Sequence, residues 1–179
     1  MAVRRMERIL RIGIIADTHG VLHPRVKELF AGIDHIIHGG DVGGAHVLRS
    51  LRELAPVTWV DGNNDASTGE DVLRFEVGGL RVLLTQILPR PHKPAPRVVA
   101  SLKEQPADLV VFGHSHLPHH EVIDGVTYFN PASAGPRRFD YPVSVGVLEK
   151  RAKEWSIAHV ALDERSAGAL IQRMNQLSV

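Results

Sequence analysis

Short apolar runs that end in polar residues recur along the first third of the chain. They occupy residues 12–16, 35–38 and 57–60. Runs of this length and composition are typical of buried strands. Between them, apolar residues repeat at helical spacing over 26–33 and 47–55, with Pro24 placed to begin one helix and Pro56 to end the other. This order predicts a mostly parallel sheet covered by helices.

The pattern changes in the second half of the chain. Two runs, 72–77 and 80–84, flank Gly78-Gly79 and predict a hairpin, as do the residues flanking Asp124-Gly125. A helix near 98–104, a buried strand at 108–112, a strand pair at 143–148 and 155–161, and a terminal helix complete the pattern. Parallel pairing early and antiparallel pairing late are both satisfied by two mixed β-sheets packed together with helices outside. We therefore expect an α/β fold.

Composition narrows the class of protein without naming a function. The 179 residues are 44% hydrophobic and 23% charged, with a formal net charge of +1, so we expect a single globular domain over 1–179. Residues 1–10 are expected to form a ragged tail. The absence of cysteine excludes disulfides and thiolate chemistry. No apolar run is long enough for a signal peptide or a membrane span, and we expect a cytoplasmic protein.

Six residues with metal-binding side chains each follow a predicted strand. They are Asp17, His19, Asp41, Asn63, His114 and His116. In sheets of this kind, ligands bind beyond the carboxyl ends of the strands. In Asp17-Thr18-His19 and His114-Ser115-His116, alternate residues would lie on one side of an extended chain, so each pair could direct two side chains at one point. We expect these six residues to form a metal centre.

The chemistry of this donor set indicates the kind of reaction. Carboxylates, imidazoles and an amide oxygen suit manganese, zinc, iron or nickel. Asp41 follows two glycines, which permit a close backbone approach, and could bridge two ions. Two ions about 3.5–4 Å apart activate a bridging water and stabilise charge during attack on phosphorus. The chain has no other evident nucleophile, since it lacks cysteine, a G-x-S-x-G motif and a P-loop.

The motifs resemble those of the calcineurin-like metallophosphoesterases, in particular the small single-domain bacterial and archaeal phosphodiesterases. The matching segments are Asp17-Thr18-His19 for D-x-H, Gly40-Asp41 for G-D, Gly62-Asn63-Asn64-Asp65 for G-N-x-D, Gly113-His114-Ser115-His116 for G-H-[ST]-H and Asn130-Pro131-Ala132-Ser133 for N-P-G-S, with alanine in place of glycine. The resemblance covers about 12–137. It implies a four-layer α/β/β/α sandwich of the metallo-dependent phosphatase type.

The resemblance also implies roles for individual residues. The first metal ion would be held by Asp17, His19, Asp41 and His116, and the second by Asp41, Asn63 and His114. A hydroxide bridging the two ions, positioned by Asp41, would attack a phosphodiester or phosphomonoester. The resemblance implies two divalent ions, with manganese favoured over zinc, iron or nickel. The expected partner is a small phosphate ester.

One departure from the family pattern affects the second ion. Relatives usually place a histidine in an L-[TS]-H-G segment after a buried strand, where this chain has Gln86. The Gln86 amide oxygen could replace that histidine as a weaker metal ligand, or Gln86 could make only a hydrogen bond. His92, six residues later, is an alternative ligand. Because of Gln86, a catalytically weakened binding or scaffold module, like the eukaryotic retromer scaffold subunit, is the alternative function.

Four further residues carry weaker expectations. Asn64 occupies a site that is often histidine in relatives; it cannot act as a general acid, but it could donate a hydrogen bond to a phosphate oxygen. Arg137 and Arg138 could contact the substrate phosphate, because arginine suits phosphate recognition. His38 could orient a metal ligand or simply belong to the core.

A nuclease is disfavoured by the near-neutral net charge of the chain. The sequence leaves the substrate open, and it leaves the oligomeric state open, with a homo-oligomer as one alternative.

Overall fold

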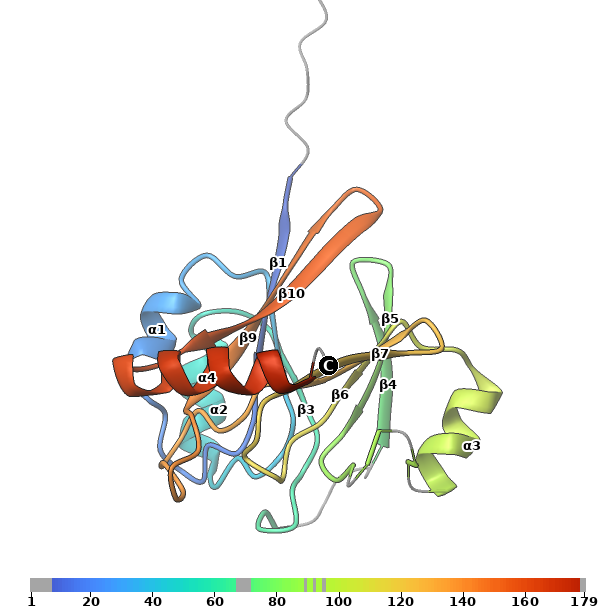
Figure 1. Cartoon of the computed structure of the whole chain (residues 1–179). Coiled ribbons are helices and arrows are strands. Elements are labelled where there is room, and N and C mark those ends of the chain that lie inside the picture. Colours follow the sequence, from blue (N-terminus) through green and yellow to red (C-terminus); the bar gives the residue numbers. More distant parts are fainter. Residues whose placement is uncertain (1–7, 67–71, 89, 92, 95, 178–179) are drawn as a thin grey trace, which may run out of the picture.

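In the computed structural model, residues 8–66, 72–88, 90–91, 93–94 and 96–177 are described. Two mixed five-stranded sheets lie at the centre (Figure 1). The first has the strand order β10-β9-β1-β2-β3 and consists of β1 (Leu10–Ile15), β2 (His35–His38), β3 (Val57–Trp59), β9 (Ser144–Arg151) and β10 (Glu154–Ala161). The second has the order β4-β5-β6-β8-β7 and consists of β4 (Val72–Val77), β5 (Leu80–Thr85), β6 (Leu109–Val111), β7 (His119–Ile123) and β8 (Val126–Asn130).

Both sheets combine parallel and antiparallel pairing, but the antiparallel strands lie on one side of the first sheet and at both edges of the second. In the first, β1 pairs with β2 and β2 with β3 in parallel, while β9 pairs antiparallel with β1 and with β10. In the second, β6 lies parallel between β5 and β8, and β4 and β7 pair antiparallel at the two edges. The expectation of two mixed sheets is therefore confirmed.

Helices cover the two outer faces. The helices α1 (Arg25–Leu29) and α2 (Ala45–Arg52) cover the first sheet, and α3 (Pro96–Glu104) covers the second. The longer α4 (Glu164–Leu177) contacts β10 and β7, which are edge strands of different sheets (Figure 1). The order of layers is that of the expected four-layer sandwich. Among the described helices, none combines the length and apolar character that a bilayer crossing requires.

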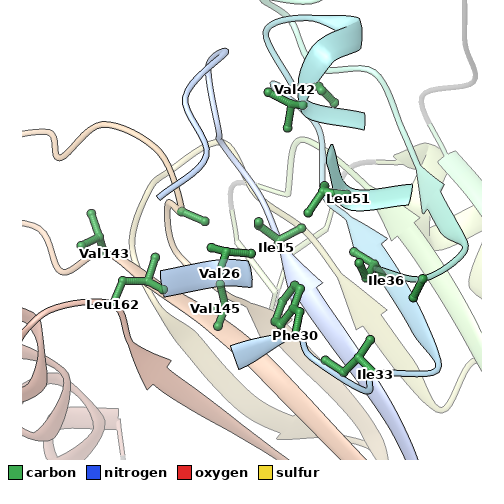
Figure 2. Close-up of a cluster of buried hydrophobic side chains, with 13 residues drawn as sticks. Ile15, Val26, Phe30, Ile33, Ile36, Val42, Leu51, Val143, Val145 and Leu162 are labelled. Carbon is green, nitrogen blue, oxygen red and sulfur yellow. The ribbon is translucent and has the colours of Figure 1, made fainter. Parts of the chain in front are cut away.

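Three apolar clusters hold the layers together, and neighbouring strand residues point into different ones. Ile15 and Ile36 pack beneath α1 and α2 with Val26 and Phe30, as Figure 2 shows. Ile14 and Ile37 belong to the cluster between the sheets, and Leu83 and Val110 to the cluster beneath α3. Because successive strand side chains point to opposite faces, strands buried on both sides are apolar throughout. That is why continuous apolar runs mark them in the sequence.

The N-terminal tail is shorter than the sequence suggested. Leu10 already lies in β1, paired with Lys150 of β9, and Arg8 forms an ion pair with Asp34. Residues 8–10 are therefore part of the folded structure, and residues 1–7 lie outside the described part of the chain. His92, the alternative metal ligand, also lies outside it.

Candidate metal centre

The carboxyl ends of β1, β2, β3, β5 and β6 supply the predicted metal ligands. Asp17 and His19 follow β1, Asp41 follows β2, and His114 and His116 follow β6. Three of these residues, Asp17, His19 and His116, have ligand atoms that lie within 4.8 Å of one another. The parallel pairing of β1 with β2 brings two of the loops together, and the packing of the sheets adds the loop after β6.

The ligand loops have an unusual backbone conformation. Left-handed φ angles occur at five of the six ligand candidates: Asp17 (52°), His19 (47°), Asp41 (52°), His114 (71°) and His116 (58°). Such angles are uncommon for residues other than glycine and concentrate at functional sites. The extended-chain reason for expecting the side chains to converge was therefore wrong. Alternate residues converge here because tight turns, rather than extended backbone, aim them at one point.

The first half of the site consists of Asp17 and His116, which are buried, and His19, which is half-buried. The Nε2 atoms of His19 and His116 lie 3.0 Å apart, His19 Nε2 lies 3.7 Å from Asp41 Oδ2, and His116 Nε2 lies 3.9 Å from Asp17 Oδ1. Two donor atoms that each lie about 2.1 Å from one ion, at a right angle, are about 3 Å apart. The spacing of the two histidine nitrogens thus suits a shared ion.

Buried polar atoms without a hydrogen-bond partner mark the same place. In the described part of the chain there are two such side-chain atoms, Asp17 Oδ2 and His116 Nδ1, and both belong to this half. Buried polar groups are almost always paired, because an unpaired one costs about 1–3 kcal/mol. A fully buried carboxylate oxygen without a partner, close to two imidazoles, fits a cation-binding site.

The titration of these groups reflects the burial of charge. Burial raises the pKa of Asp17 to about 8; the His114 backbone N–H opposes this effect and the nearby Asp41 carboxylate adds to it. Burial lowers the pKa of His116 to about 4, helped by the positive Arg138, and burial also lowers the pKa of His19. Without a cation, this pocket favours neutral side chains. A divalent cation would reverse that preference, because it stabilises the carboxylate and needs unprotonated imidazoles.

The second half of the site is neutral and more open. Asn63 Oδ1 lies 3.0 Å from His114 Nδ1, and the Gln86 amide nitrogen lies 3.3 Å from the same Nδ1. Asn63 and His114 are exposed, whereas Gln86 is buried. The assignment of oxygen and nitrogen in an amide is exchangeable by a 180° rotation, so Gln86 can present its oxygen at this point. The structure thus brings Gln86 to the two predicted ligands of the second ion.

Asp41 lies between the two halves. Its carboxylate accepts hydrogen bonds from the backbone N–H of Asn64 at 3.0 Å and from the Asn64 amide at 2.7 Å. Gly62 permits this approach, because a Cβ there would lie 2.0 Å from Asp41 Oδ1. Asn64 therefore positions the Asp41 carboxylate. Its expected hydrogen bond to a substrate phosphate stays a prediction.

A buried series of hydrogen bonds through His38 and Thr18 supports the Asp17–His19 loop. The Gly40 N–H donates to His38 Nδ1 at 3.2 Å, so the proton of the neutral imidazole is on Nε2, which donates to Thr18 Oγ1 at 3.0 Å. The Thr18 hydroxyl in turn donates to the Val42 carbonyl at 2.9 Å. Burial lowers the pKa of His38 to about 4, which keeps the imidazole neutral. Of the two roles weighed for His38, the contacts favour orientation of the ligand loop.

Two positioning residues were not identified from the sequence. Asp65 accepts hydrogen bonds from the N–H groups of Val42, Gly43 and Gly62 and so joins the loops after β2 and β3. The pKa of Asp65 is lowered, because the hydrogen bonds from the three N–H groups outweigh the opposite effect of burial. Asn130 donates from its amide to the Gly113 carbonyl and to Ser115 Oγ, which fixes the His114–His116 loop. An Asp closing a Gly-Asn-Asn-Asp turn is the signal that could have found the first.

The two arginines after the Asn130 motif lie in different environments. Arg137 donates to the Tyr141 carbonyl, to Asp163 at 2.6 Å and to Ser166 Oγ at 3.0 Å. The guanidinium of Arg138 lies 3.4 Å from His19 Nε2 and is exposed. These contacts favour Arg138, rather than Arg137, as the arginine available to a substrate phosphate.

Comparison with known proteins shows the same family along most of the chain. The family described as "Calcineurin-like phosphoesterase superfamily domain" matches residues 10–153. A protein of Methanothermobacter thermautotrophicus described as "Probable metallophosphoesterase" is 33% identical over 147 residues, covering 76% of this chain and 84% of the relative. The Escherichia coli phosphodiesterase YfcE is 29% identical over 181 residues, covering 88% of this chain and 95% of YfcE.

A solved structure reproduces the fold. A single mutant of Vps29 from Entamoeba histolytica superposes with a TM-score of 0.72 at 21% identity, covering 88% of this chain and 95% of that one. At this level of identity the likeness concerns the fold alone. The architecture described above is therefore shared by Vps29 and by the solved structure of the E. coli phosphoesterase YfcE, which superposes with a TM-score of 0.60.

Proposed function

Because this chain belongs to the calcineurin-like phosphoesterase superfamily, we propose that it is a metal-dependent phosphodiesterase with a two-ion centre. The observation that carries the proposal is the buried Asp17 carboxylate, which has an unpartnered oxygen and lies beside the paired His19 and His116 nitrogens. The same pocket without an ion would contain a buried acid that titrates near pH 8. This arrangement has a clear chemical purpose only if a cation completes it.

The residues divide the work between two ions. Asp17, His19, Asp41 and His116 would hold the first, and Asp41, Asn63, Gln86 and His114 the second. When bound, the ions supply Lewis-acid chemistry: they make water acidic enough to act as a nucleophile near neutral pH and offset charge on the phosphate. Carboxylate, imidazole and amide donors suit manganese, zinc, iron or nickel. Manganese is the preferred ion because the family resemblance favours it. Asn64 holds Asp41, and Arg138 binds the phosphate.

A direct test uses bis(4-nitrophenyl) phosphate, an aryl phosphodiester, with added manganese. We expect turnover that chelation abolishes and manganese restores, together with calorimetric binding of two ions per chain. Asp17→Asn is the matched control, since it keeps the shape of the side chain and removes its charge. Absence of turnover with every divalent ion, combined with absence of ion binding, would overturn the proposal.

One observation favours a second candidate function. Gln86 gives the second half a neutral amide where relatives are expected to have imidazole, and this half has no charged ligand of its own apart from the shared Asp41. A binding or scaffold module that keeps the fold and binds one ion without turnover would account for this. The same titration distinguishes the two candidates: one bound ion and no hydrolysis favours the module, and two ions with hydrolysis favours the enzyme.

A further inference from the structure

A tight turn at the edge of the metal centre presents an exposed aromatic ring. Phe139 has 82% of its surface exposed, more than any other large hydrophobic side chain in the described residues. The Tyr141 ring lies beside it, with the ring centroids 5.4 Å apart and an interplanar angle of 57°. Scattered exposed hydrophobic residues are ordinary on protein surfaces. The conformation and surroundings of this one set it apart.

The backbone at Phe139 is in a conformation that disfavours a large side chain. The Tyr141 N–H donates to the Arg138 carbonyl at 3.1 Å and closes a β-turn, with Phe139 as its first central residue. The φ of Phe139 is 51°, a value at which glycine or asparagine is expected in such turns. For a bulky residue this conformation is strained, and it persists only where the surroundings enforce it.

Ionic contacts hold the turn in place. Arg137 donates to the Tyr141 carbonyl at 2.7 Å and pairs with Asp163 at 2.6 Å, just before α4 begins. Arg165, in the first turn of α4, pairs with Asp140 inside the turn. The turn is therefore tied to the α4 end of the molecule at two points. The backbone that carries Phe139 is therefore held before a ligand binds, which lowers the ordering cost of binding.

The same segment is joined directly to the ligand loop of the first ion. Ser133 Oγ donates to the Asp17 carbonyl at 2.8 Å. Gly135 packs so closely on this loop that a Cβ would lie 2.2 Å from the Thr18 carbonyl oxygen. Arg138, which immediately precedes Phe139, places its guanidinium 3.4 Å from His19 Nε2. Phe139, with its exposed aromatic ring, thus directly follows Arg138, whose positively charged side chain reaches the metal centre.

From this geometry we propose that Phe139, supported by Tyr141, binds a flat aromatic group carried on the substrate's phosphate ester, while Arg138 contacts the phosphate. The inference rests on the proposed function and specifies its substrate class: phosphate esters with an aromatic group close to the phosphorus atom. A fixed aromatic ring favours an aromatic partner through offset or edge-to-face packing. Strained backbone concentrates at functional sites, which supports a binding role for this turn.

Two non-hydrolysable phosphonate probes, compared at a pH where both are dianions, test the proposal. Phenylphosphonate and methylphosphonate carry one phosphonate group each and differ in the aromatic ring. We expect calorimetry on the manganese-loaded protein to show tighter binding of phenylphosphonate. Phe139→Ala should reduce that preference roughly 2- to 10-fold, while methylphosphonate binding stays unchanged. Phe139→Tyr should keep the preference, and Val122→Ala, an exposed apolar residue on β7, is the surface control.

Each outcome decides the proposal. Equal binding of the two probes by the wild-type protein would overturn it, as would a preference that survives Phe139→Ala or binding of neither probe. Unchanged methylphosphonate binding by Phe139→Ala also shows that the variant is folded. The proposed function is tested separately. A phenyl preference without diester turnover supports the aromatic site and contradicts the proposed phosphodiesterase activity. Diester turnover without a phenyl preference supports the activity and contradicts the aromatic site.

Discussion

The two halves of the metal centre place their ligands in opposite environments. In the half formed by Asp17, His19 and His116, Asp17 and His116 are buried, His19 is half-buried, and burial raises the pKa of Asp17 to about 8. The half formed by Asn63, Gln86 and His114 has two exposed side chains and no acid. Asp41 is shared. An ion in the first half would offset a buried charge, whereas an ion in the second half would be held by neutral donors and by Asp41.

This difference teaches that the two ions would not bind equally. Charge that is buried without a partner destabilises the protein, so an ion that pairs with it contributes to folding as well as to chemistry. Neutral amides offer only a dipole, and an exposed ligand pair keeps contact with water. We therefore expect tight binding in the first half and weaker, readily reversible binding in the second.

The largest effect is expected from removing the charge of the first half. Asp17→Asn should lower kcat by about 10³-fold or more, because a ligand that the first ion requires is lost. In the metal-free protein the same change should be stabilising. The folded pKa of about 8 lies above the unfolded value of 3.8, so the cost of ionising Asp17 appears as the pH rises from about 4 to 8.

Chemical denaturation of the chelated protein at several pH values measures this effect. At pH 9 the free energy of unfolding of Asp17→Asn should exceed that of the wild type by on the order of 2–5 kcal/mol, and the gap should close towards pH 4. A variant that loses both activity and metal-free stability at pH 9 would contradict the role assigned to the buried charge. Asn63→Ala, in the exposed half, is the matched control and should show no such pH-dependent gain.

The second largest effect is expected from giving the second half a second imidazole ligand, as the first half has. Gln86→His replaces a neutral amide with an imidazole next to His114 and should tighten binding of the second ion about 10- to 100-fold. Metal titration by calorimetry measures it, with hydrolysis of the aryl diester followed in parallel. Gln86→Met, which keeps the length of the side chain without an amide oxygen, should weaken the second ion. Equal affinities in all three proteins would show that residue 86 contributes nothing to metal binding.

A smaller effect is expected at the point where the halves join. Asn64→Ala removes the 2.7 Å hydrogen bond to Asp41 Oδ2 but leaves the backbone N–H bond in place. We expect kcat to fall about 10-fold, with the free energy of unfolding changed by less than about 0.5 kcal/mol because Asn64 is exposed. Steady-state kinetics and thermal unfolding test both parts. A large loss of stability with unchanged kcat would contradict a positioning role.

The smallest effect on activity is expected from the buried support of the first half. Thr18→Val leaves His38 Nε2–H without its acceptor, which should cost about 1–3 kcal/mol in unfolding free energy and reduce kcat only a few-fold. Paired measurement of denaturant unfolding and of the first ion's affinity tests this. Ser115→Ala, on the exposed side of the His114–His116 loop, provides the comparison and should destabilise the protein less.

Much of the architecture follows from local pattern. The apolar run 12–16 predicted β1, because strands buried on both faces are rich in apolar residues, and Ile36-Ile37 between two histidines predicted β2. The Gly78-Gly79 and Asp124-Gly125 turns predicted the two hairpins of the second sheet. The ligand candidates were found because polar residues after buried strands collect at one edge of a parallel sheet.

Other features depend on contacts between segments far apart in the chain. The family resemblance placed Gln86 at the second ion, but no local pattern indicated that Arg137 would pair with Asp163 while Arg138 reached His19. Adjacent arginines have the same local propensities, and the position of α4 decides which one pairs with an acid. Only the packed structure gives these neighbours.

The sequence by itself determined the two mixed sheets and the set of residues that could bind metal. Hydrophobic periodicity and side-chain chemistry are local properties, and both can be identified from the sequence. The tertiary structure alone decided that the centre has a buried, ionisable half and an exposed, neutral half. That difference arises from desolvation, which depends on what packs around Asp17 and His114 rather than on the residues themselves.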